Sequence, residues 1–114
     1  MKLLLKRVYE PNAKTDGFRV LVDRLWPRGI TKAAAKIDLW DKEIAPSSQL
    51  RSWFHSDREK RFNEFVKKYD RELETGTAVT NLKQSLKGEK IVTLITAVKD
   101  IEHSHIPTIL RHLR

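Results

Sequence analysis

The chain contains no cysteine among its 114 residues. Without a thiol it can form no disulfide, bind no zinc through thiolates and perform no thiol catalysis or redox sensing. It also lacks a long apolar run, because the opening segment MKLLLKRVYE is continuously apolar only from Leu3 to Leu5. Such a start fits neither a signal peptide nor a membrane span. We therefore expect a soluble, cytoplasmic protein that does not associate with membranes.

Several nucleotide-binding, catalytic and metal-binding motifs are absent as well. The chain has no glycine-rich phosphate loop, no G-x-S-x-G turn and no H-E-x-x-H helix. These motifs supply, in turn, backbone N–H groups around a phosphate, an exposed serine nucleophile and two histidine ligands for zinc. Their absence predicts a protein with no cofactor and no resident metal.

The charge that is present is basic and unevenly distributed. The chain has 23 Lys and Arg residues against 15 Asp and Glu residues, a net charge of +8. Residues 1–36 alone contain nine basic and three acidic residues, a net of +6. A positive field favours anionic partners, either a small molecule or a nucleic acid. The alternative is that this charge only keeps a small domain soluble.

Apolar runs of strand length predict three main β-strands, at residues 3–9, 18–26 and 91–98. A further extended stretch is predicted at residues 37–40. The centre of the second strand, Val20-Leu21-Val22, is continuously apolar, which is typical of a parallel strand covered on both faces. The run at 91–98 is the most strand-like of the chain and is predicted to be the central strand.

Helical patterns fill the intervals between these strands. Thr31 can cap a brief helix at residues 32–36, and Ser47 or Ser48 can cap a helix through Phe54. A capping box at residues 56–59 is predicted to begin a longer helix. The apolar stripe of that helix is Phe62, Phe65, Val66, Tyr69 and Leu73.

Two further helices complete the predicted architecture. A short one precedes Gly88, and the last one begins between Ser104 and Pro107, where proline is tolerated in the first turn. Strands separated by helices predict a single α/β domain over residues 1–114. We expect three layers, with a mostly parallel sheet flanked by helices.

Ionisable residues gather where two of the predicted strands end. Residues 23–29 (DRLWPRG) follow the second strand, and residues 99–105 (KDIEHSH) follow the central strand. In open parallel sheets, ligands bind beyond the carboxyl ends of the strands, because helix N-termini and loop amides converge there. If these two strands are neighbours, both segments border one pocket beside the start of the last helix.

The candidate residues in this pocket fall into three groups. Guanidinium and ammonium groups can hold a phosphate or carboxylate, and the candidates are Arg24, Arg28 and Lys99. The candidate catalytic acids and bases are Asp23, Asp100 and His103. Further candidates for the lining are Trp26 and His105.

Each of these groups also has a purely structural interpretation. Asp23 and Arg24 are consecutive, so on a regular strand their side chains point to opposite faces, and they share a pocket only if the chain bends. Arg24 or Arg28 could pair with an acid that follows the central strand. Lys99 and Asp100 could likewise form a salt bridge at the strand end.

Histidine and tryptophan residues leave similar alternatives. His103 and His105 form an H-x-H pair that could supply two metal ligands, but no third ligand motif accompanies them. Capping the last helix or bonding a backbone carbonyl is the default role for at least one of the two. Trp26, Trp40 and Trp53 could stack on bases, although packing is the more frequent use of such side chains.

Five stretches together resemble the YeaO-like branch of the domain of unknown function 488 family over nearly the whole chain. They are R-V-L-V-D-R-L-W-P-R-G at 19–29, D-L-W at 38–40, E-I-A-P-S at 43–47, L-R-x-W-F at 50–54, and V-T-L at 92–94 followed by K-D at 99–100 and His103. The resemblance implies a small intracellular α/β protein whose activity is not established. Members of the wider family often carry a cysteine-and-histidine element after the central strand, whereas this chain has only His103 and His105 there.

Two functional hypotheses follow. The first is a small α/β protein with a phosphate or carboxylate site at the strand ends, which leaves open whether the site is catalytic. The alternative is a non-enzymatic nucleic-acid or protein-binding module that uses the basic N-terminal third. Nucleic-acid binding of that kind would weaken steeply with added salt.

Overall fold

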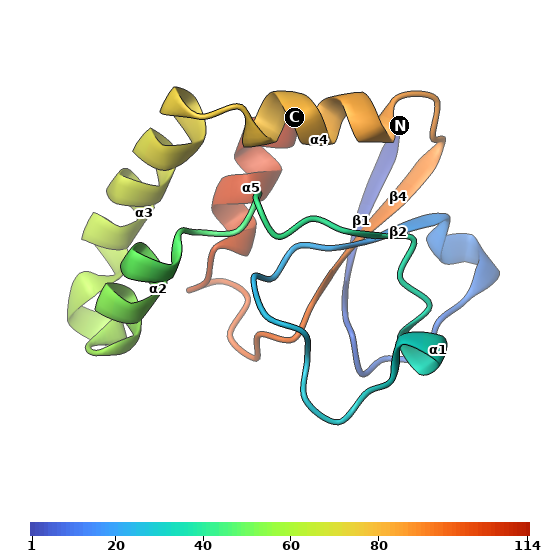
Figure 1. Cartoon of the computed structure of the whole chain (residues 1–114), viewed down its shortest axis with the longest axis horizontal. Coiled ribbons are helices and arrows are strands. Elements are labelled where there is room, and N and C mark those ends of the chain that lie inside the picture. Colours follow the sequence, from blue (N-terminus) through green and yellow to red (C-terminus); the bar gives the residue numbers. More distant parts are fainter.

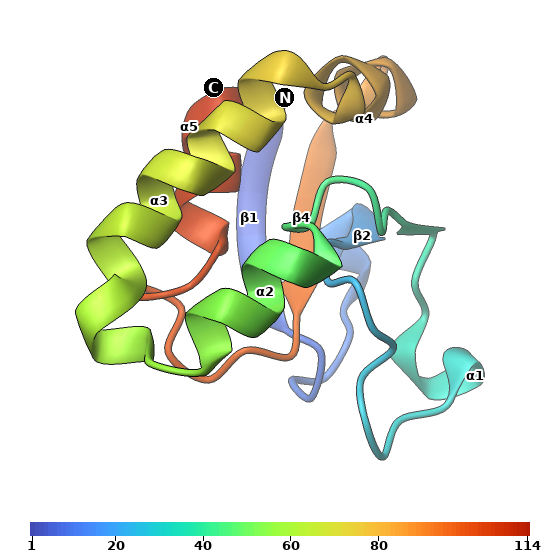
Figure 2. The same ribbon diagram turned by 60° about the vertical axis from the view of Figure 1, so that its left-hand side comes forward.

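Four parallel strands form one sheet in the computed structural model, which describes residues 1–114. Their order is β1-β4-β2-β3, and each adjacent pair is hydrogen-bonded. Figures 1 and 2 label β1, β4 and β2 of this sheet. The strands are β1 (Lys2–Arg7), β2 (Phe18–Leu21), β3 (Leu39–Trp40) and β4 (Ile91–Thr96). The predicted α/β class with a parallel sheet is confirmed.

Strand β4 lies at the centre of this sheet, as its sequence predicts. It pairs with β1 on one side and with β2 on the other. Val92, Leu94 and Ile95 are fully buried, because both faces of the strand are covered. The two polar residues of the strand, Thr93 and Thr96, are buried too, and Thr93 Oγ1 donates a hydrogen bond to the carbonyl of Asp16.

Helices cover the two faces of the sheet unequally (Figures 1 and 2). Over one face lie α2 (Ser48–His55), α3 (Arg58–Thr75), α4 (Ala78–Leu86) and α5 (Ile106–Leu113). The other face has only the single turn of α1 (Lys32–Ala35) and the short 3-10 helix η1 (Lys14–Asp16). Val20 and Val22 point into the large core beneath the four helices, and Leu21 points into a smaller cluster on the opposite face. Successive side chains of an extended segment point to opposite faces of the sheet. Because both faces are covered here, Val20, Leu21 and Val22 are all apolar.

The main core forms where α2 crosses α3. Ser47 begins α2 by accepting a hydrogen bond from the backbone N–H of Leu50. Phe54 stacks on Phe65 with ring centroids 4.1 Å apart. Tyr69 is fully buried on the same stripe of α3 and donates a hydrogen bond to the carbonyl of Ile44. No helix of the structure combines the length and the apolarity that crossing a bilayer requires.

On the opposite face, a buried arginine joins α1 to β2. Arg19 is 5% exposed, and its Nη1 donates to Asp16 Oδ2 at 2.6 Å. Its Nε and Nη2 donate to the carbonyls of Lys36 and Ala35, which end α1. Lys6 from β1 also pairs with Asp16, at 2.8 Å. One buried carboxylate therefore connects β1, β2 and α1.

Two local predictions are wrong. Strand β2 ends at Leu21 instead of continuing to Trp26, because Asp23 turns away from the ladder to bind backbone and side-chain groups beyond β4. Ser56 forms no capping box for α3, which begins after Asp57 without a side-chain cap. Its hydroxyl instead donates to the carbonyl of Trp53, so Ser56 belongs to the end of α2.

Candidate functional site

A cavity of about 470 Å³ lies beyond the carboxyl ends of β2 and β4. Because these strands are neighbours, the segments that follow them lie side by side. The segment after β2 contributes residues 23–28, and the segments after β4 contribute residues 97–99 and 104–105. Helix α2 and the loop before it provide the facing wall, and Arg58 is added from the start of α3.

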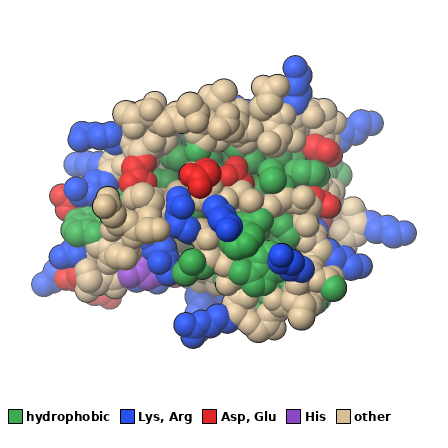
Figure 3. Space-filling model, in the orientation of Figure 1, with side chains coloured by type: hydrophobic (Ala, Val, Ile, Leu, Met, Phe, Trp, Pro, Cys, Tyr) green, Lys and Arg blue, Asp and Glu red, His purple; other side chains and the backbone are tan.

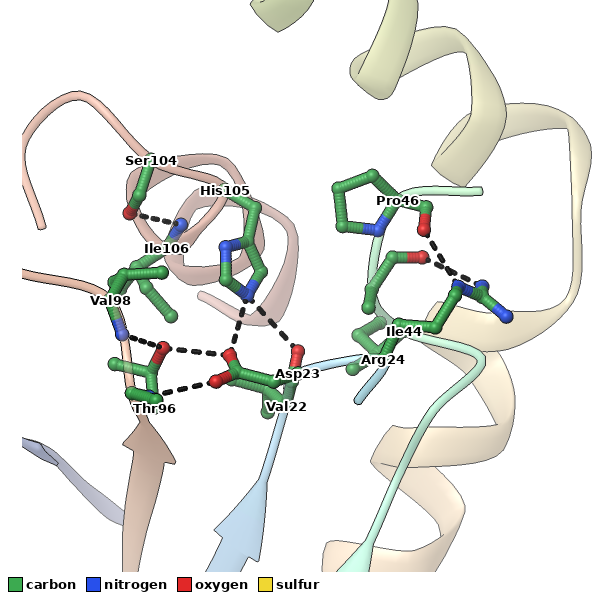
Figure 4. A network of polar contacts seen from close by, with 12 residues as sticks. Val22, Asp23, Arg24, Ile44, Pro46, Thr96, Val98, Ser104, His105 and Ile106 are labelled. Carbon is green, nitrogen blue, oxygen red and sulfur yellow. Dashed lines mark hydrogen bonds and ion pairs between the residues drawn. The ribbon is translucent and has the colours of Figure 1, made fainter. Parts of the chain in front are cut away.

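Asp23 is the polar hub between the two strand ends (Figure 4). Its Oδ1 accepts a hydrogen bond from Thr96 Oγ1 at 2.7 Å, and its Oδ2 accepts one from the backbone N–H of Ala97 at 2.8 Å. The same Oδ1 lies 3.1 Å from His105 Nε2. The carboxylate is 13% exposed and every contact is short, so its position is set by the fold.

His105 donates from Nε2. This nitrogen lies 3.1 Å from the carbonyl oxygen of Val22 as well as 3.1 Å from Asp23 Oδ1. A carbonyl can only accept a hydrogen bond, so the proton must reside on Nε2. His105 thereby joins the start of α5 to the end of β2. Bonding a backbone carbonyl is the structural role predicted from the sequence for at least one of the two histidines.

The pKa of Asp23 lies below its usual range. Burial alone would raise this pKa, but the hydrogen bond and charge of His105, together with the Ala97 N–H and the Thr96 hydroxyl, outweigh it. The group is therefore an ionised hydrogen-bond acceptor over the ordinary pH range. Such a carboxylate organises the site and is poorly suited to exchange protons with a ligand.

Arg24 shares the cavity with Asp23 because the chain bends after β2. The bend removes the alternation of a regular strand, which would have sent the two side chains to opposite faces. The Arg24 guanidinium lies along the facing loop, where Nε donates to the carbonyl of Pro46 at 2.9 Å and Nη2 to that of Ala45 at 3.3 Å (Figure 4). Neither bond neutralises its charge.

Four more cationic side chains line the same cavity: Arg28, Arg51, Arg58 and Lys99. None of the four forms an ion pair within the chain, and none donates a side-chain hydrogen bond to another residue. The only carboxylate in the lining is Asp23, which is already bound by His105. The cavity therefore carries an uncompensated positive charge.

The pKa of His55 is affected by this positive charge. Partial burial lowers the pKa of its imidazole, and the positive charges of Arg58, Arg51 and His105 lower it further. His55 lines the cavity from the last turn of α2. Near neutral pH the imidazole is uncharged, and an anion placed among the same arginines would favour its protonated form.

The loop that carries Arg28 is fixed from three directions. The Tyr9 hydroxyl donates to the carbonyl of Arg28 at 3.0 Å. Trp26 bonds through Nε1 to the carbonyl of Ile30 and packs edge-on against Trp40 with centroids 5.3 Å apart. Trp40 Nε1 donates in turn to the carbonyl of Asp23 at 2.7 Å. These tryptophans position the cavity wall.

The structure does not bring all predicted site residues together. The cavity is lined by Asp23, Arg24, Trp26, Arg28, Lys99 and His105, but not by Asp100 or His103. His103 Nδ1 lies 3.0 Å from Asp100 Oδ2, and both side chains are about three-fifths exposed, at 60% and 59%. The ring of His103 packs edge-on against Phe62 instead. The H-x-H pair thus diverges, and no group of three or more metal-ligating side chains forms.

Three basic residues of the lining were not identified from the sequence: Arg51, His55 and Arg58. The spacing of four residues places Arg51 and His55 on one face of α2, and that is the signal that could have found these two. Arg58 lies beyond the break between the helices, at the start of α3. Arg58 instead resembles part of the mixed-charge outer face of α3. Its guanidinium lies over the Phe54 ring, 5.4 Å from the centroid, which turns it towards α2.

The basic N-terminal third does not form one free surface. Lys6 and Arg19 pair with Asp16, and Arg7 donates to the carbonyls of Ala97 and Val98. On the face shown in Figure 3, Lys and Arg side chains project at the left, right and lower edges and near the centre, without gathering in a single patch. Three of the nine basic residues in this part of the chain are therefore engaged in contacts within the fold.

Comparisons with known proteins return uncharacterized relatives. The sequence model described as the inactive DUF488-N3 subclade matches residues 2–114. An uncharacterized protein of Mycobacterium tuberculosis is 42% identical over 104 residues, which cover 91% of this chain and 86% of that protein. The uncharacterized protein YeaO of Escherichia coli is 56% identical over 57 residues, half of each chain. No solved structure gives a significant match.

Proposed function

Since this chain belongs to the inactive DUF488-N3 subclade, we propose that its cationic cavity binds an anionic ligand, a phosphate or a carboxylate, without converting it. The membership confirms the family resemblance that the motif at residues 19–29 indicates. The relatives carry no described activity, so the proposal depends on the chemistry of the cavity.

The observation that supports it is the unpaired charge of Arg28, Arg51, Arg58 and Lys99 around one hollow. Like charges held together on a surface raise the free energy of the folded chain unless a counter-charge joins them. An anion supplies that counter-charge. Three of the four groups are guanidinium forks, which bind the oxygens of a phosphate or carboxylate in pairs.

Binding without turnover fits the remaining lining. Asp23 holds its charge through three donors, while Asp100 and His103 lie outside the cavity. The hydroxyl of Ser104 donates to the carbonyl of Ile101 and accepts from the N–H of Ile106, so it is not activated as a nucleophile. The Ser104 hydroxyl is bonded only to backbone groups, so no general base is in contact with it.

Inorganic phosphate is the direct probe. We expect it to bind to the wild-type chain by titration calorimetry at constant ionic strength, and to raise the midpoint of thermal unfolding. The double variant Arg28→Ala/Arg51→Ala should weaken binding by at least about 100-fold, since charge-assisted hydrogen bonds contribute about 1.5–3 kcal/mol each and two such groups are removed.

The matched control is Arg71→Ala on the exposed side of α3, which removes one positive charge away from the cavity. It should leave the affinity for phosphate unchanged. If phosphate does not bind, or if Arg71→Ala weakens binding as much as the cavity variant does, the effect is one of net charge and the proposed site is wrong.

Affinity should also depend on pH through His55. Burial and then the positive surroundings lower the pKa of His55, so acidification adds a charge to the cavity, and a bound anion favours that protonation. Sulfate, whose charge is constant in this range, should bind roughly fivefold more tightly at pH 5.5 than at pH 7.5, since one added charge at about 4 Å contributes about 1 kcal/mol in water. His55→Gln should lose this dependence, and an unchanged pH profile in the variant would contradict the assignment.

A further inference from the structure

The anion site occupies only part of its cavity. We propose, building on the proposed anion binding, that the physiological ligand is an organic anion whose charged group is attached to an apolar, flat body such as an aromatic ring. The charged group contacts the arginines, and the body lies against the apolar remainder of the lining. This remainder includes Leu25, Trp26, Pro27, Pro46 and Val98.

The size of the cavity supports an organic ligand. Its volume of about 470 Å³ falls within the range of roughly 300–1,000 Å³ that is usual for small-molecule sites. A water molecule takes up about 30 Å³ in the liquid, and a phosphate ion has only five heavy atoms. Inorganic phosphate would therefore leave most of the cavity, and most of its apolar wall, in contact with water.

Exposed apolar side chains mark the mouth of this cavity. Only three large apolar side chains of the chain are exposed: Met1, Tyr9 at 47% and Leu25 at 57%. Scattered exposed apolar residues need no explanation. Here, however, both Tyr9 and Leu25 line the same cavity. An apolar ligand body would remove this surface from water, which is the main source of affinity for such a group.

The apolar and cationic groups are interleaved on one fixed loop. Leu25 lies in the sequence between Arg24 and Arg28, and the loop is held at both of these positions by hydrogen bonds to Pro46 and Tyr9. The contact surface thus exists before a ligand arrives, which lowers the entropic cost of binding. On the facing wall, the Arg58 guanidinium already covers the Phe54 ring. A planar group can stack on this guanidinium in the same way.

The experiment compares inorganic phosphate with 1-naphthyl phosphate, 1-naphthoate and uncharged 1-naphthol by titration calorimetry. We expect 1-naphthyl phosphate or 1-naphthoate to bind at least about tenfold more tightly than inorganic phosphate, and 1-naphthol to bind more weakly than either charged naphthyl compound. The stronger of the two charged compounds identifies the charged group as phosphate or carboxylate.

Variants of Leu25 test the apolar contact itself. Leu25→Ser should weaken binding of the charged naphthyl compounds about fivefold to tenfold and change that of inorganic phosphate less than twofold. Leu25→Met keeps an apolar side chain and should retain the affinity. Since Leu25 is exposed, the thermal unfolding midpoint of both variants should match that of the wild type.

The outcomes separate this inference from the anion site on which it rests. If naphthyl phosphate and naphthoate bind no more tightly than inorganic phosphate, or if Leu25→Ser weakens all anions equally, the apolar body is wrong while the anion site stands. If none of the anions binds, both proposals are overturned. Equal binding of 1-naphthol and its phosphate would likewise remove the role of the arginines.

Discussion

Replacing Arg19 by methionine is expected to lower the free energy of unfolding by about 3–5 kcal/mol, the usual loss when one partner of a buried ion pair is removed. Arg19 and Asp16 are both nearly inaccessible, and Arg19 also satisfies the carbonyls of Ala35 and Lys36. Methionine fills similar space but leaves these acceptors without a donor. Urea unfolding followed by circular dichroism measures the change.

Lys6→Met provides the matched control for this prediction. Lys6 pairs with the same carboxylate of Asp16, but its side chain is 25% exposed and makes only one other hydrogen bond, to the carbonyl of Pro11. Water can replace it, so the loss should be about 1 kcal/mol or less. Equal losses in the two variants would show that the charge of Asp16, and not the buried fork of Arg19, holds α1 in place.

Asp23→Asn is expected to lower the free energy of unfolding by about 2–4 kcal/mol at pH 7, because a buried charged network loses its acceptor. The asparagine oxygen can accept from the Ala97 N–H, but its amide then faces His105 Nε2, which is itself a donor. His105 cannot accept from that amide through Nε2 without abandoning the carbonyl of Val22. Two donors are thus left opposed between β2 and α5.

The pH dependence of this effect has a definite sign. The pKa of Asp23 is lower in the folded chain than in the unfolded one, so its contribution is complete above the unfolded value of about 3.9. It is lost as the pH falls through the folded pKa. The difference in stability between the wild type and Asp23→Asn should therefore shrink below about pH 4.

The control for Asp23→Asn is Asp100→Asn, because Asp100 follows the neighbouring strand but is exposed. It should change the stability by less than about 0.5 kcal/mol. A small effect of Asp23→Asn at pH 7, or a difference that grows on acidification, would contradict the role of Asp23 as the ionised hub. Urea unfolding at pH 7 and pH 3.5 distinguishes these results.

The local sequence pattern was sufficient to predict those strands and helices whose surroundings are uniform along their length. β4 was predicted because residues 91–98 form the most strand-like run of the chain, rich in β-branched side chains. Helix α3 was predicted from an apolar stripe that recurs at helical spacing, and Phe65, Tyr69 and Leu73 are indeed its buried residues. The Thr31 cap of α1 was also correct. In each case the decisive interactions lie within a few residues.

Elements that end through distant partners were not predicted in detail. β2 stops at Leu21 because the Asp23 carboxylate finds donors at Thr96 and Ala97, more than seventy residues along the chain. His103 was grouped with Lys99 because they are close in sequence, but the turn between them directs the imidazole towards Phe62. Neither partner can be inferred from neighbouring residues.

The cationic cavity shows the same division. Residues that directly follow the strands, such as Arg28 and Lys99, could be placed at the sheet edge by a general rule for parallel sheets. Residues of the facing wall, such as Arg51 and His55, depend on how α2 packs across that edge. The spacing of Arg51 and His55 could place them on one helix face. It could not predict that this face points towards the cavity.

The strand order limits how the sheet can fold while the chain is being synthesised. β1 and β2 are each made early, yet they are not adjacent in the sheet, and the strand that separates them is the last one of the chain. Until residues 91–96 have emerged, β1 has no strand beside it and its leucines lack their cover. The joining of β1 to β2 therefore waits until β4 has been made, and a chain that has not reached β4 is exposed to aggregation and to chaperones.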